Sequence, residues 1–201
     1  NREKGLPRSI LTTVLNDPDT GAPLAIMSAN ALSAARTGAI PAVGAKYFAR
    51  NQAETVRAIG IGVIGRACLE ALMDVLKSIR EIRLCDIDEA AAKRYAEELR
   101  EKYKVSVKVA ASVEEAVRGS DVVNVATSGS VSPRIEDEWL KEGALLTLPA
   151  SADISETLMM DSRIVVDNWE MYEVYAEELR NAKGGFGKNL SGICGFMMDL
   201  V

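Results

Sequence analysis

The stretch Thr55-Val-Arg-Ala-Ile-Gly60-Ile-Gly62-Val-Ile-Gly65-Arg-Ala67 decides the fold of this 201-residue chain. A β-branched run leads into glycines spaced as G-x-G-x-x-G, and helical periodicity follows over residues 64–78. In such a unit the first glycine, Gly60, permits a tight turn. The second, Gly62, lets the backbone approach a pyrophosphate, and the third, Gly65, lets the helix pack close to the strand. The N–H groups of Val63, Ile64 and Gly65 would then face the phosphates at the positive end of the helix dipole.

The motif is unspecific by itself, but the chain around it alternates regularly between strand and helix patterns. Strands are predicted over residues 55–61, 81–86, 105–109, 121–126, 144–148 and 163–167, and helices over residues 64–78, 89–103, from 112, 136–141, 155–160 and 169–181. This alternation predicts an α/β fold with a doubly wound parallel sheet of the Rossmann type.

The N-terminal part has a different pattern. Residues 9–15 and 23–28 predict a β-hairpin, and a helix rich in small residues follows to about residue 50, with Ser28 or Asn30 as its cap. We therefore expect residues 1–50 to be part of a second domain. Residues 51–181 would be the dinucleotide-binding domain, and residues 182–201 a return segment towards the second domain. Because the chain starts at Asn1 and ends on an apolar run, we also expect it to be a fragment.

Composition excludes several functions. The net charge is −5, which disfavours nucleic acid or an anionic membrane as a partner, and no apolar run reaches membrane-spanning length. The chain has no histidine, which excludes His-based triads and disfavours a zinc site, so no metal is predicted. The three cysteines, Cys68, Cys85 and Cys194, lack C-x-x-C spacing, which is typical of buried thiols in a cytoplasmic protein.

Asp86 ends the second strand of the alternating region, 21 residues after Gly65. An acid at this place accepts hydrogen bonds from the adenine-ribose hydroxyls of NAD, and its charge repels the 2′-phosphate of NADP. The alternative is that Asp86 merely ends the strand. For Asp88, a helix cap is the preferred interpretation.

Three further features lie at the expected carboxyl edge of the sheet or on the small-residue helix. Thr127 and Ser128 follow a strand and could bind the cofactor or be a solvated loop. Arg36 could bind a carboxylate bidentately or be an ordinary surface residue. Asp153 could be a proton acceptor near the nicotinamide or a helix cap, for which Ser155 competes.

Taken together, these residues resemble the ornithine cyclodeaminase/mu-crystallin family. The resemblance rests on Arg36-Thr37 in an Ala-rich helix, the glycine loop some 24 residues later, and an Asp-bearing loop before Val165-Val166-Asp167. It extends from about Gly5 to about Leu179.

The resemblance implies a homodimer and NAD(P)-linked chemistry at the α-carbon of amino or imino acids. It also implies that residues 1–50 are part of a substrate and dimerisation domain. Arg36 falls where the family's arginine holds the substrate carboxylate, Thr37 would lie by the cofactor phosphates, and Asp153 falls on the family's catalytic aspartate. Further substrate-binding Arg and Lys residues would lie upstream of residue 1.

The chain also departs from the family pattern. Asp153 follows Ala152 in a Ser-Ala-Asp setting where the family has Gly-Ala-Asp or Gly-Gly-Asp. The family's Thr-x-Ser-x-x-Pro loop appears one residue longer, from Thr127 to Pro133, so the hydroxyl that touches the cofactor is ambiguous. Asp167-Asn-Trp-Glu170 resembles the branch that makes siderophore precursors.

The leading hypothesis is an NAD-dependent amino-acid dehydrogenase or imine reductase. Arg36 would anchor the α-carboxylate and Asp153 would relay protons. One alternative is ornithine cyclodeaminase, in which a side-chain amine attacks the imine and the hydride returns to it. Another is a catalytically idle NAD(P)-binding protein of the mu-crystallin type.

Overall fold

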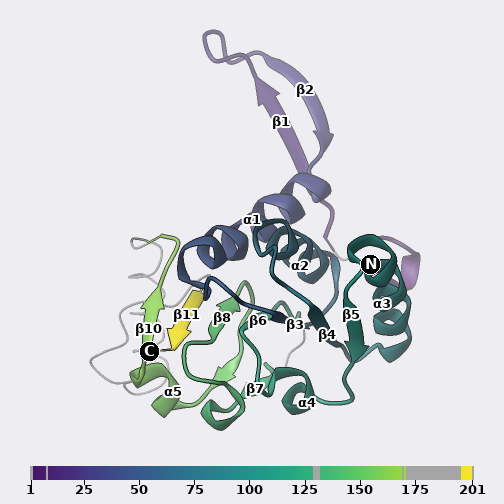
Figure 1. Ribbon diagram of the computed structural model, residues 1–201. Coiled ribbons are helices and arrows are strands. Elements are labelled where there is room, and N and C mark those ends of the chain that lie inside the picture. Colours follow the sequence, from purple (N-terminus) through teal and green to yellow (C-terminus); the bar gives the residue numbers. More distant parts are fainter. Residues whose placement is uncertain (1, 8, 129–131, 169, 171–195, 201) are drawn as a thin grey trace.

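A computed structural model of the chain describes residues 2–7, 9–128, 132–168, 170 and 196–200. At its centre is a sheet with the strand order β10-β11-β8-β6-β3-β4-β5 (Figure 1). Its strands are β3 (Thr55–Ile59), β4 (Glu81–Cys85), β5 (Ser106–Val109), β6 (Val122–Val125), β8 (Leu145–Leu148), β10 (Ser162–Val165) and β11 (Phe196–Leu200).

The strands from β5 to β8 are all parallel, and their order is that of a Rossmann fold. The order reverses between β3 and β6, so the switch point lies where the glycine loop leaves β3. The predicted fold class is therefore confirmed.

Strand β11 is a feature that the sequence patterns did not predict. It lies antiparallel between β8 and β10, with Phe196 opposite Leu148 and Leu200 opposite Ser162. Residues 196–200 were included in the predicted return segment, whereas the structure pairs them with the sheet. The helix predicted over residues 169–181 lies outside the described residues except for Glu170, which is helical.

Helices and short elements cover both faces of the sheet (Figure 1). One face carries α1 (Asn30–Phe48), α2 (Val63–Val75) and α3 (Glu89–Tyr103); the other carries α4 (Val113–Val117), η2 (Asp137–Trp139), α5 (Glu156–Met160) and the pair β7 (Arg134–Ile135) and β9 (Asp153–Ile154). Successive strand residues alternate between the two cores: Val122 packs in the first and Val123 in the second. Residues 136–141 form only the 3₁₀ turn η2, which is shorter than the predicted helix.

Helix α3 has the predicted bounds, and both of its ends are well defined in the structure. The Asp88 side chain caps it by accepting from the Ala91 N–H at 2.8 Å. Lys104 follows in the left-handed conformation, with φ 57°, and ends it. The cap interpretation of Asp88 is thus confirmed.

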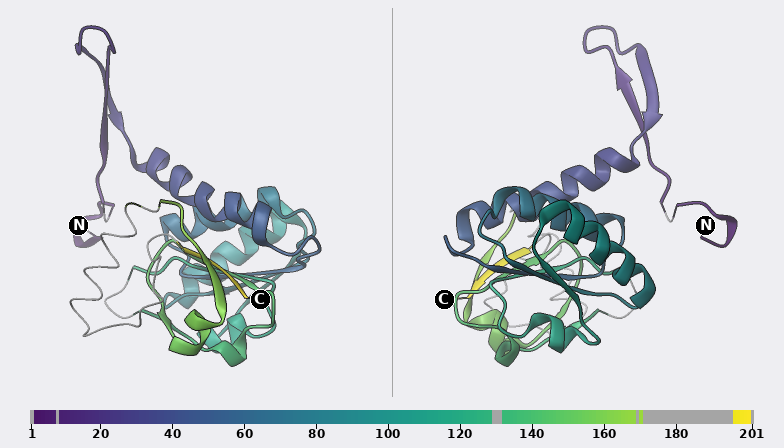
Figure 2. Two further views of the ribbon diagram at one scale, coloured as in Figure 1. Left: turned by 90° about the vertical axis from the view of Figure 1, so that its left-hand side faces the viewer. Right: turned by 45° about the vertical axis from the view of Figure 1, so that its right-hand side comes forward.

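The predicted hairpin is present as β1 (Thr12–Asn16) and β2 (Pro23–Ser28), and it projects away from the sheet (Figures 1 and 2). A short 3₁₀ helix, η1 (Arg2–Lys4), precedes it. The hairpin's apolar side chains are exposed, Ile26 by 73%. Figure 2 shows α1 running from the hairpin to the body of the molecule.

The predicted cap of α1 is wrong: neither Ser28 nor Asn30 caps this helix. The Asn30 side chain instead accepts from the Leu11 N–H at 2.8 Å and donates to the Ser9 carbonyl at 3.0 Å. It therefore fixes the chain leading into the hairpin. Among the described helices, none is long and apolar enough to cross a membrane.

Both cysteines in the described residues are free thiols. Cys68 is buried as predicted, and burial raises the pKa of its thiol to about 12. Cys85 is only half-buried, and burial together with the nearby Asp86 and Glu115 carboxylates raises the pKa of its thiol. Cys194 lies outside the described residues.

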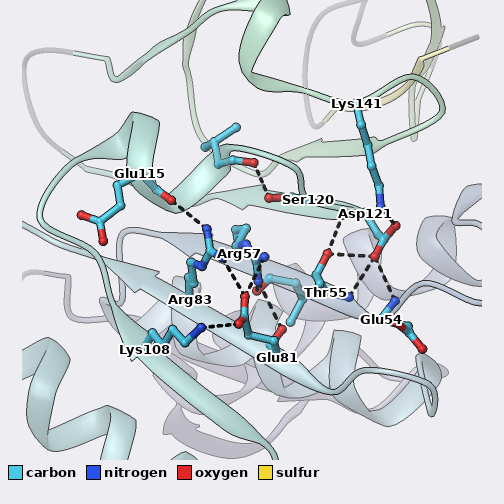
Figure 3. Close-up of polar contacts among 12 residues, drawn as sticks. Glu54, Thr55, Arg57, Glu81, Arg83, Lys108, Glu115, Ser120, Asp121 and Lys141 are labelled. Carbon is cyan, nitrogen blue, oxygen red and sulfur yellow. Dashed lines mark hydrogen bonds and ion pairs between the residues drawn. The ribbon is translucent and has the colours of Figure 1, made fainter.

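The side chains around the amino ends of the parallel strands form a dense network of charges (Figure 3). Arg57 is 1% exposed and pairs with the Glu81 carboxylate at 3.0 Å. Arg83 and Lys108, on the next two strands, pair with the same carboxylate at 3.1 and 2.7 Å. The hydrogen bond from Lys108 and the charges of the two arginines lower the pKa of Glu81, whereas burial lowers the pKa of Arg57 to about 10.

A second acid, Asp121, joins β6 to the start of β3 (Figure 3). Its carboxylate accepts from the N–H groups of Glu54 and Thr55 at 2.9 and 3.0 Å and from the Thr55 hydroxyl at 2.8 Å, and it pairs with Lys141. Burial acts to raise the pKa of Asp121, but the bonds from Lys141, Thr55 and Glu54 outweigh it and hold the pKa below the ordinary value.

Candidate cofactor and substrate site

The three glycines of the loop after β3 are each required for a different reason. Gly60 has φ +83°, and a Cβ there would lie 2.9 Å from the Ala126 carbonyl. A Cβ on Gly65 would lie 1.9 Å from the Gly60 oxygen, so only glycine lets α2 pack this close to the strand end. A Cβ on Gly62 would meet no atom within 4 Å. The loop is therefore tightly packed at its first and third glycines and open at its second.

Helix α2 begins at this open side. Gly62 is its N-cap residue, and no side chain caps the helix. Its first backbone bond runs from the Arg66 N–H to the Gly62 carbonyl at 2.9 Å. The N–H groups of Val63, Ile64 and Gly65 precede that bond, so they are positioned for an anion at the positive end of the helix dipole.

Asp86 lies directly beside the glycine loop. Its Oδ2 accepts from the Ile61 N–H at 2.8 Å, and its Oδ1 accepts from the Asp88 N–H at 2.9 Å. Each carboxylate oxygen has a second lone pair, so both can still accept a ligand hydroxyl. Asp86 therefore does more than end a strand, because it positions the loop.

The loop after β6 contacts the same glycines. The backbone nitrogen of Thr127 would lie 3.0 Å from a Cβ on Gly60. Thr127 is half-buried and Ser128 is exposed. The predicted cofactor contacts of these two hydroxyls stay predictions.

Helix α1, which carries Arg36 and Thr37, packs closely against α2. A Cβ on Gly38 would lie 2.6 Å from the Ala67 carbonyl oxygen, which explains why this part of α1 is poor in bulk. Arg36 is exposed, and it makes no hydrogen bond or ion pair with the part of the chain that the structure describes. The Thr37 hydroxyl donates to the Ser33 carbonyl at 2.8 Å, so it can offer a ligand its lone pairs but not its proton.

Asp153 is the first residue of β9 and is exposed. Its carboxylate pairs with Arg134 Nη1 at 3.0 Å, and its N–H donates to the Pro133 carbonyl at 2.8 Å. It does not cap α5, because the Ser155 hydroxyl accepts from the Leu158 N–H at 3.1 Å. Ser155 is therefore the cap of α5, as the alternative interpretation predicted, and the Asp153 carboxylate is not used for capping.

Only some of the predicted site residues contact one another in the structure. The glycine loop, Asp86 and Thr127 are in direct contact, whereas Arg36 and Thr37 lie on α1, which contacts α2 at Gly38. Among the described residues, no hydrogen bond or ion pair connects Asp153 to the loop or to Arg36.

The sequence patterns did not single out two arginines that contact the predicted residues. Arg134 pairs with Asp153 and also with Glu136 at 2.8 Å. The Arg66 Nε donates to the Ile61 carbonyl at 3.1 Å. The only available signal for Arg66 was its place directly after Gly65.

The strand order, the open Gly62 and the uncapped α2 define a Rossmann-type protein with a dinucleotide-type site at its switch point. The chain belongs to the ornithine cyclodeaminase/mu-crystallin family, whose family model matches residues 1–184.

A curated relative, the alanine dehydrogenase of Archaeoglobus fulgidus, is 34% identical over 85% of this chain and 53% of its own length. The solved structure of Thermococcus litoralis Δ1-pyrroline-2-carboxylate reductase, in complex with NADH and L-proline, matches with a TM-score of 0.74 and 34% identity. That match covers 84% of this chain and 53% of the reductase.

An archaeal alanine dehydrogenase dimer with bound NAD matches with a TM-score of 0.75 and 30% identity, over 90% of this chain and 58% of the other. The chain thus spans a little over half the length of these relatives.

Proposed function

We propose that the chain belongs to an NAD-dependent oxidoreductase that acts at the α-carbon of an amino or imino acid. The observation that carries the proposal is the glycine loop, which is packed at Gly60 and Gly65, open at Gly62, and contacted by Asp86. Family membership and the NAD-bound and NADH-bound relatives support the same cofactor.

The residues present fit a dinucleotide. The pyrophosphate would bind the N–H groups of Val63, Ile64 and Gly65, because no side chain caps α2. The adenine ribose would bind the spare lone pairs of Asp86, and the negative charge of this residue favours NAD over NADP. Thr127 and Ser128 would add hydroxyl contacts, and Thr37 would donate to a phosphate once its hydroxyl turns away from the Ser33 carbonyl.

The bound dinucleotide supplies the site that takes up or gives back a hydride. Arg36 would hold the substrate α-carboxylate with two parallel hydrogen bonds and so orient the α-carbon. Asp153 would accept a proton from the substrate amine, or return one to the imine. The Asp153 carboxylate would first have to exchange its pairing with Arg134 for the substrate, and the exposure of both side chains makes this exchange inexpensive.

The proposal is tested by adding a panel of amino acids and NAD to the whole protein and following the NADH absorbance band. Steady NADH formation with at least one amino acid is expected, and a thermal-shift titration should show stabilisation by NAD in the same sample. Stabilisation by neither NAD nor NADP would contradict the cofactor assignment.

The cyclodeaminase reaction is a second candidate, favoured by the family to which the chain belongs. Cyclodeamination returns the hydride, so it releases ammonia without net NADH. An idle NAD(P)-binding protein would be stabilised by the nucleotide and would convert no amino or imino acid. Ammonia and NADH measured together therefore distinguish the three possibilities.

We further propose that the whole protein is a cytoplasmic homodimer, as the dimeric alanine dehydrogenase suggests. Residues 1–50 would belong to the substrate and dimerisation domain, because the hairpin exposes apolar side chains that a partner surface would bury. Residues 51–181 would form the dinucleotide domain, to whose sheet residues 196–200 add strand β11. The resemblance to the siderophore branch at Asp167-Asn-Trp-Glu170 makes amino-acid precursors of siderophores candidate substrates.

A further inference from the structure

We propose that Arg66 is a positioning residue of the dinucleotide site. It would hold the carbonyl of Ile61 while Asp86 holds the N–H of the same residue, and together they would keep the glycine loop in the conformation that receives the pyrophosphate. This inference rests on the proposed function for its effect on binding, but not for its effect on the loop itself.

The two backbone polar groups of Ile61 are held by side chains of opposite charge. Arg66 Nε donates to the Ile61 oxygen at 3.1 Å, and Asp86 Oδ2 accepts from the Ile61 nitrogen at 2.8 Å. Both bonds involve an ionised group, and such bonds are stronger than neutral ones. Ile61 is thus fixed on both of its backbone polar groups.

The loop needs this restraint because glycines flank Ile61. Gly60 and Gly62 carry no Cβ, so the peptides beside Ile61 have wide conformational freedom. Ordering such a loop when a ligand binds would weaken affinity, whereas a loop ordered in advance avoids that cost. Arg66 supplies the order from within the helix that begins at the loop.

Helix α3 fixes the guanidinium of Arg66 in turn. The group stacks over the Tyr95 ring, 4.0 Å from its centroid, and pairs with Glu98 at 3.3 Å. Tyr95 is only 3% exposed, which provides a rigid surface, and the Arg66 side chain is 34% exposed. Because α3 sets the position of Arg66, it also sets the position of the Ile61 carbonyl.

The same pair of helices offers a matched control. One turn further along, Lys102 of α3 pairs with Glu70 of α2 at 2.7 Å. This pair also joins α2 to α3 and is also partly exposed, but it makes no contact with the glycine loop. Lys102→Met therefore removes an equivalent ion pair without affecting Ile61.

The first test measures amide hydrogen exchange in the cofactor-free protein. Arg66→Met keeps an apolar stem for Tyr95 but removes the donors, so exchange of the hydrogen-bonded amides of Gly60 and Ile61 should rise about tenfold, while Lys102→Met leaves them unchanged. Equal exchange of these amides in the wild type and Arg66→Met would overturn the inference, whether or not the protein binds NAD.

The second test measures NADH binding by fluorescence, together with kcat and KM. Arg66→Met should weaken binding about tenfold, equal to about 1.4 kcal/mol, and raise the KM for NAD with little change in kcat. Arg66→Lys should recover only part of the affinity, because an ammonium lacks the fork that reaches Ile61 and Glu98 together.

Full recovery by Arg66→Lys would show that positive charge alone suffices and would contradict the inference. Weaker NADH binding with unchanged exchange would indicate direct contact of Arg66 with the cofactor, which also contradicts it. If the wild type binds neither NAD nor NADP, the proposed function fails, while the exchange measurement still decides the role of Arg66.

Discussion

Charged residues at the amino ends and at the carboxyl ends of the parallel strands of the central sheet differ in their pairing. Around the amino ends of the strands, the buried Arg57 pairs with the partly buried Glu81, and the buried Asp121 accepts from the Thr55 N–H (Figure 3). At the carboxyl edge, Asp153 is exposed, and Arg36, on the helix that packs against α2, has no partner among the described residues.

This difference separates charges that hold the fold from charges that are available to a ligand. Removing one partner of a buried pair leaves an uncompensated charge and costs several kcal/mol, whereas an exposed residue can be changed at little cost in stability. Substitutions at the amino edge should therefore reduce stability, and those at the carboxyl edge should reduce binding or turnover.

The largest effect is expected for Arg36→Ala. Loss of a bidentate contact with the substrate carboxylate should lower kcat/KM about 1000-fold, with the free energy of unfolding changed by less than about 0.5 kcal/mol. Steady-state kinetics and denaturant unfolding measure the two quantities. Lys46→Ala, an exposed cation later on the same helix, is the control and should leave both unchanged. Unaltered kinetics in Arg36→Ala would refute the role of Arg36.

At the amino edge, Glu81→Gln should lower the free energy of unfolding by about 3 kcal/mol, because the buried Arg57 loses its counter-charge. Affinity for NAD, measured by titration at a temperature where the variant is folded, should not change. Glu89→Gln, which breaks the exposed pair with Lys93, is the control and should cost less than about 0.5 kcal/mol. Equal losses of unfolding free energy in Glu81→Gln and Glu89→Gln would contradict a structural role for the buried charges at the amino ends of the strands.

Asp121→Asn should cost about 2 kcal/mol at neutral pH, because a neutral amide oxygen accepts weaker bonds from Glu54 and Thr55 and an amide cannot form an ion pair with Lys141. The pKa of Asp121 is lowered in the folded protein, so its contribution is complete above the unfolded pKa of about 4 and is lost as the pH falls through the lower folded value. The difference in stability between wild type and Asp121→Asn should therefore shrink below about pH 4. A difference that grows as the pH falls would contradict the assignment.

The smallest effect is expected for Gly62→Ala. A Cβ at Gly62 meets no protein atom, so stability should change by less than about 0.5 kcal/mol, while binding of NAD should weaken roughly tenfold if the pyrophosphate occupies that space. Gly65→Ala is the contrasting variant, because its Cβ would lie 1.9 Å from the Gly60 oxygen. It should lose about 2 kcal/mol of stability through overpacking. Thermal unfolding of both variants checks that Gly65→Ala is the less stable one.

Local sequence signals predicted much of the fold. Helix α3 could be predicted to the residue because Asp88 marks its start and the next predicted strand begins at residue 105, and the Rossmann order followed from the alternation around the glycine loop. Strand β11 could not be predicted, since its pairing with Leu148 is antiparallel and non-local. The cap of α1 was missed because Asn30 bonds to Ser9 and Leu11, some twenty residues earlier.

The candidate site was predicted as a set of residue types but not as a set of contacts. Spacing placed Asp86 near the glycine loop, yet its bond to the Ile61 N–H depends on how β3 and β4 end side by side. The pairing of Asp153 with Arg134 depends on two strands of two residues each, which leave no periodic pattern. Arg66 was missed because a cation on an exposed helix surface is ordinary until the fold brings it to Ile61.

The most direct measurement of the central claim is a calorimetric titration of NAD into the wild-type protein and into Gly62→Ala. We expect saturable binding to one site per chain in the wild type, tighter for NAD than for NADP, and roughly tenfold weaker binding in the folded variant. Equal binding by the two proteins, or no binding of either nucleotide to the wild type, would contradict the assignment of residues 60–65 as the cofactor loop.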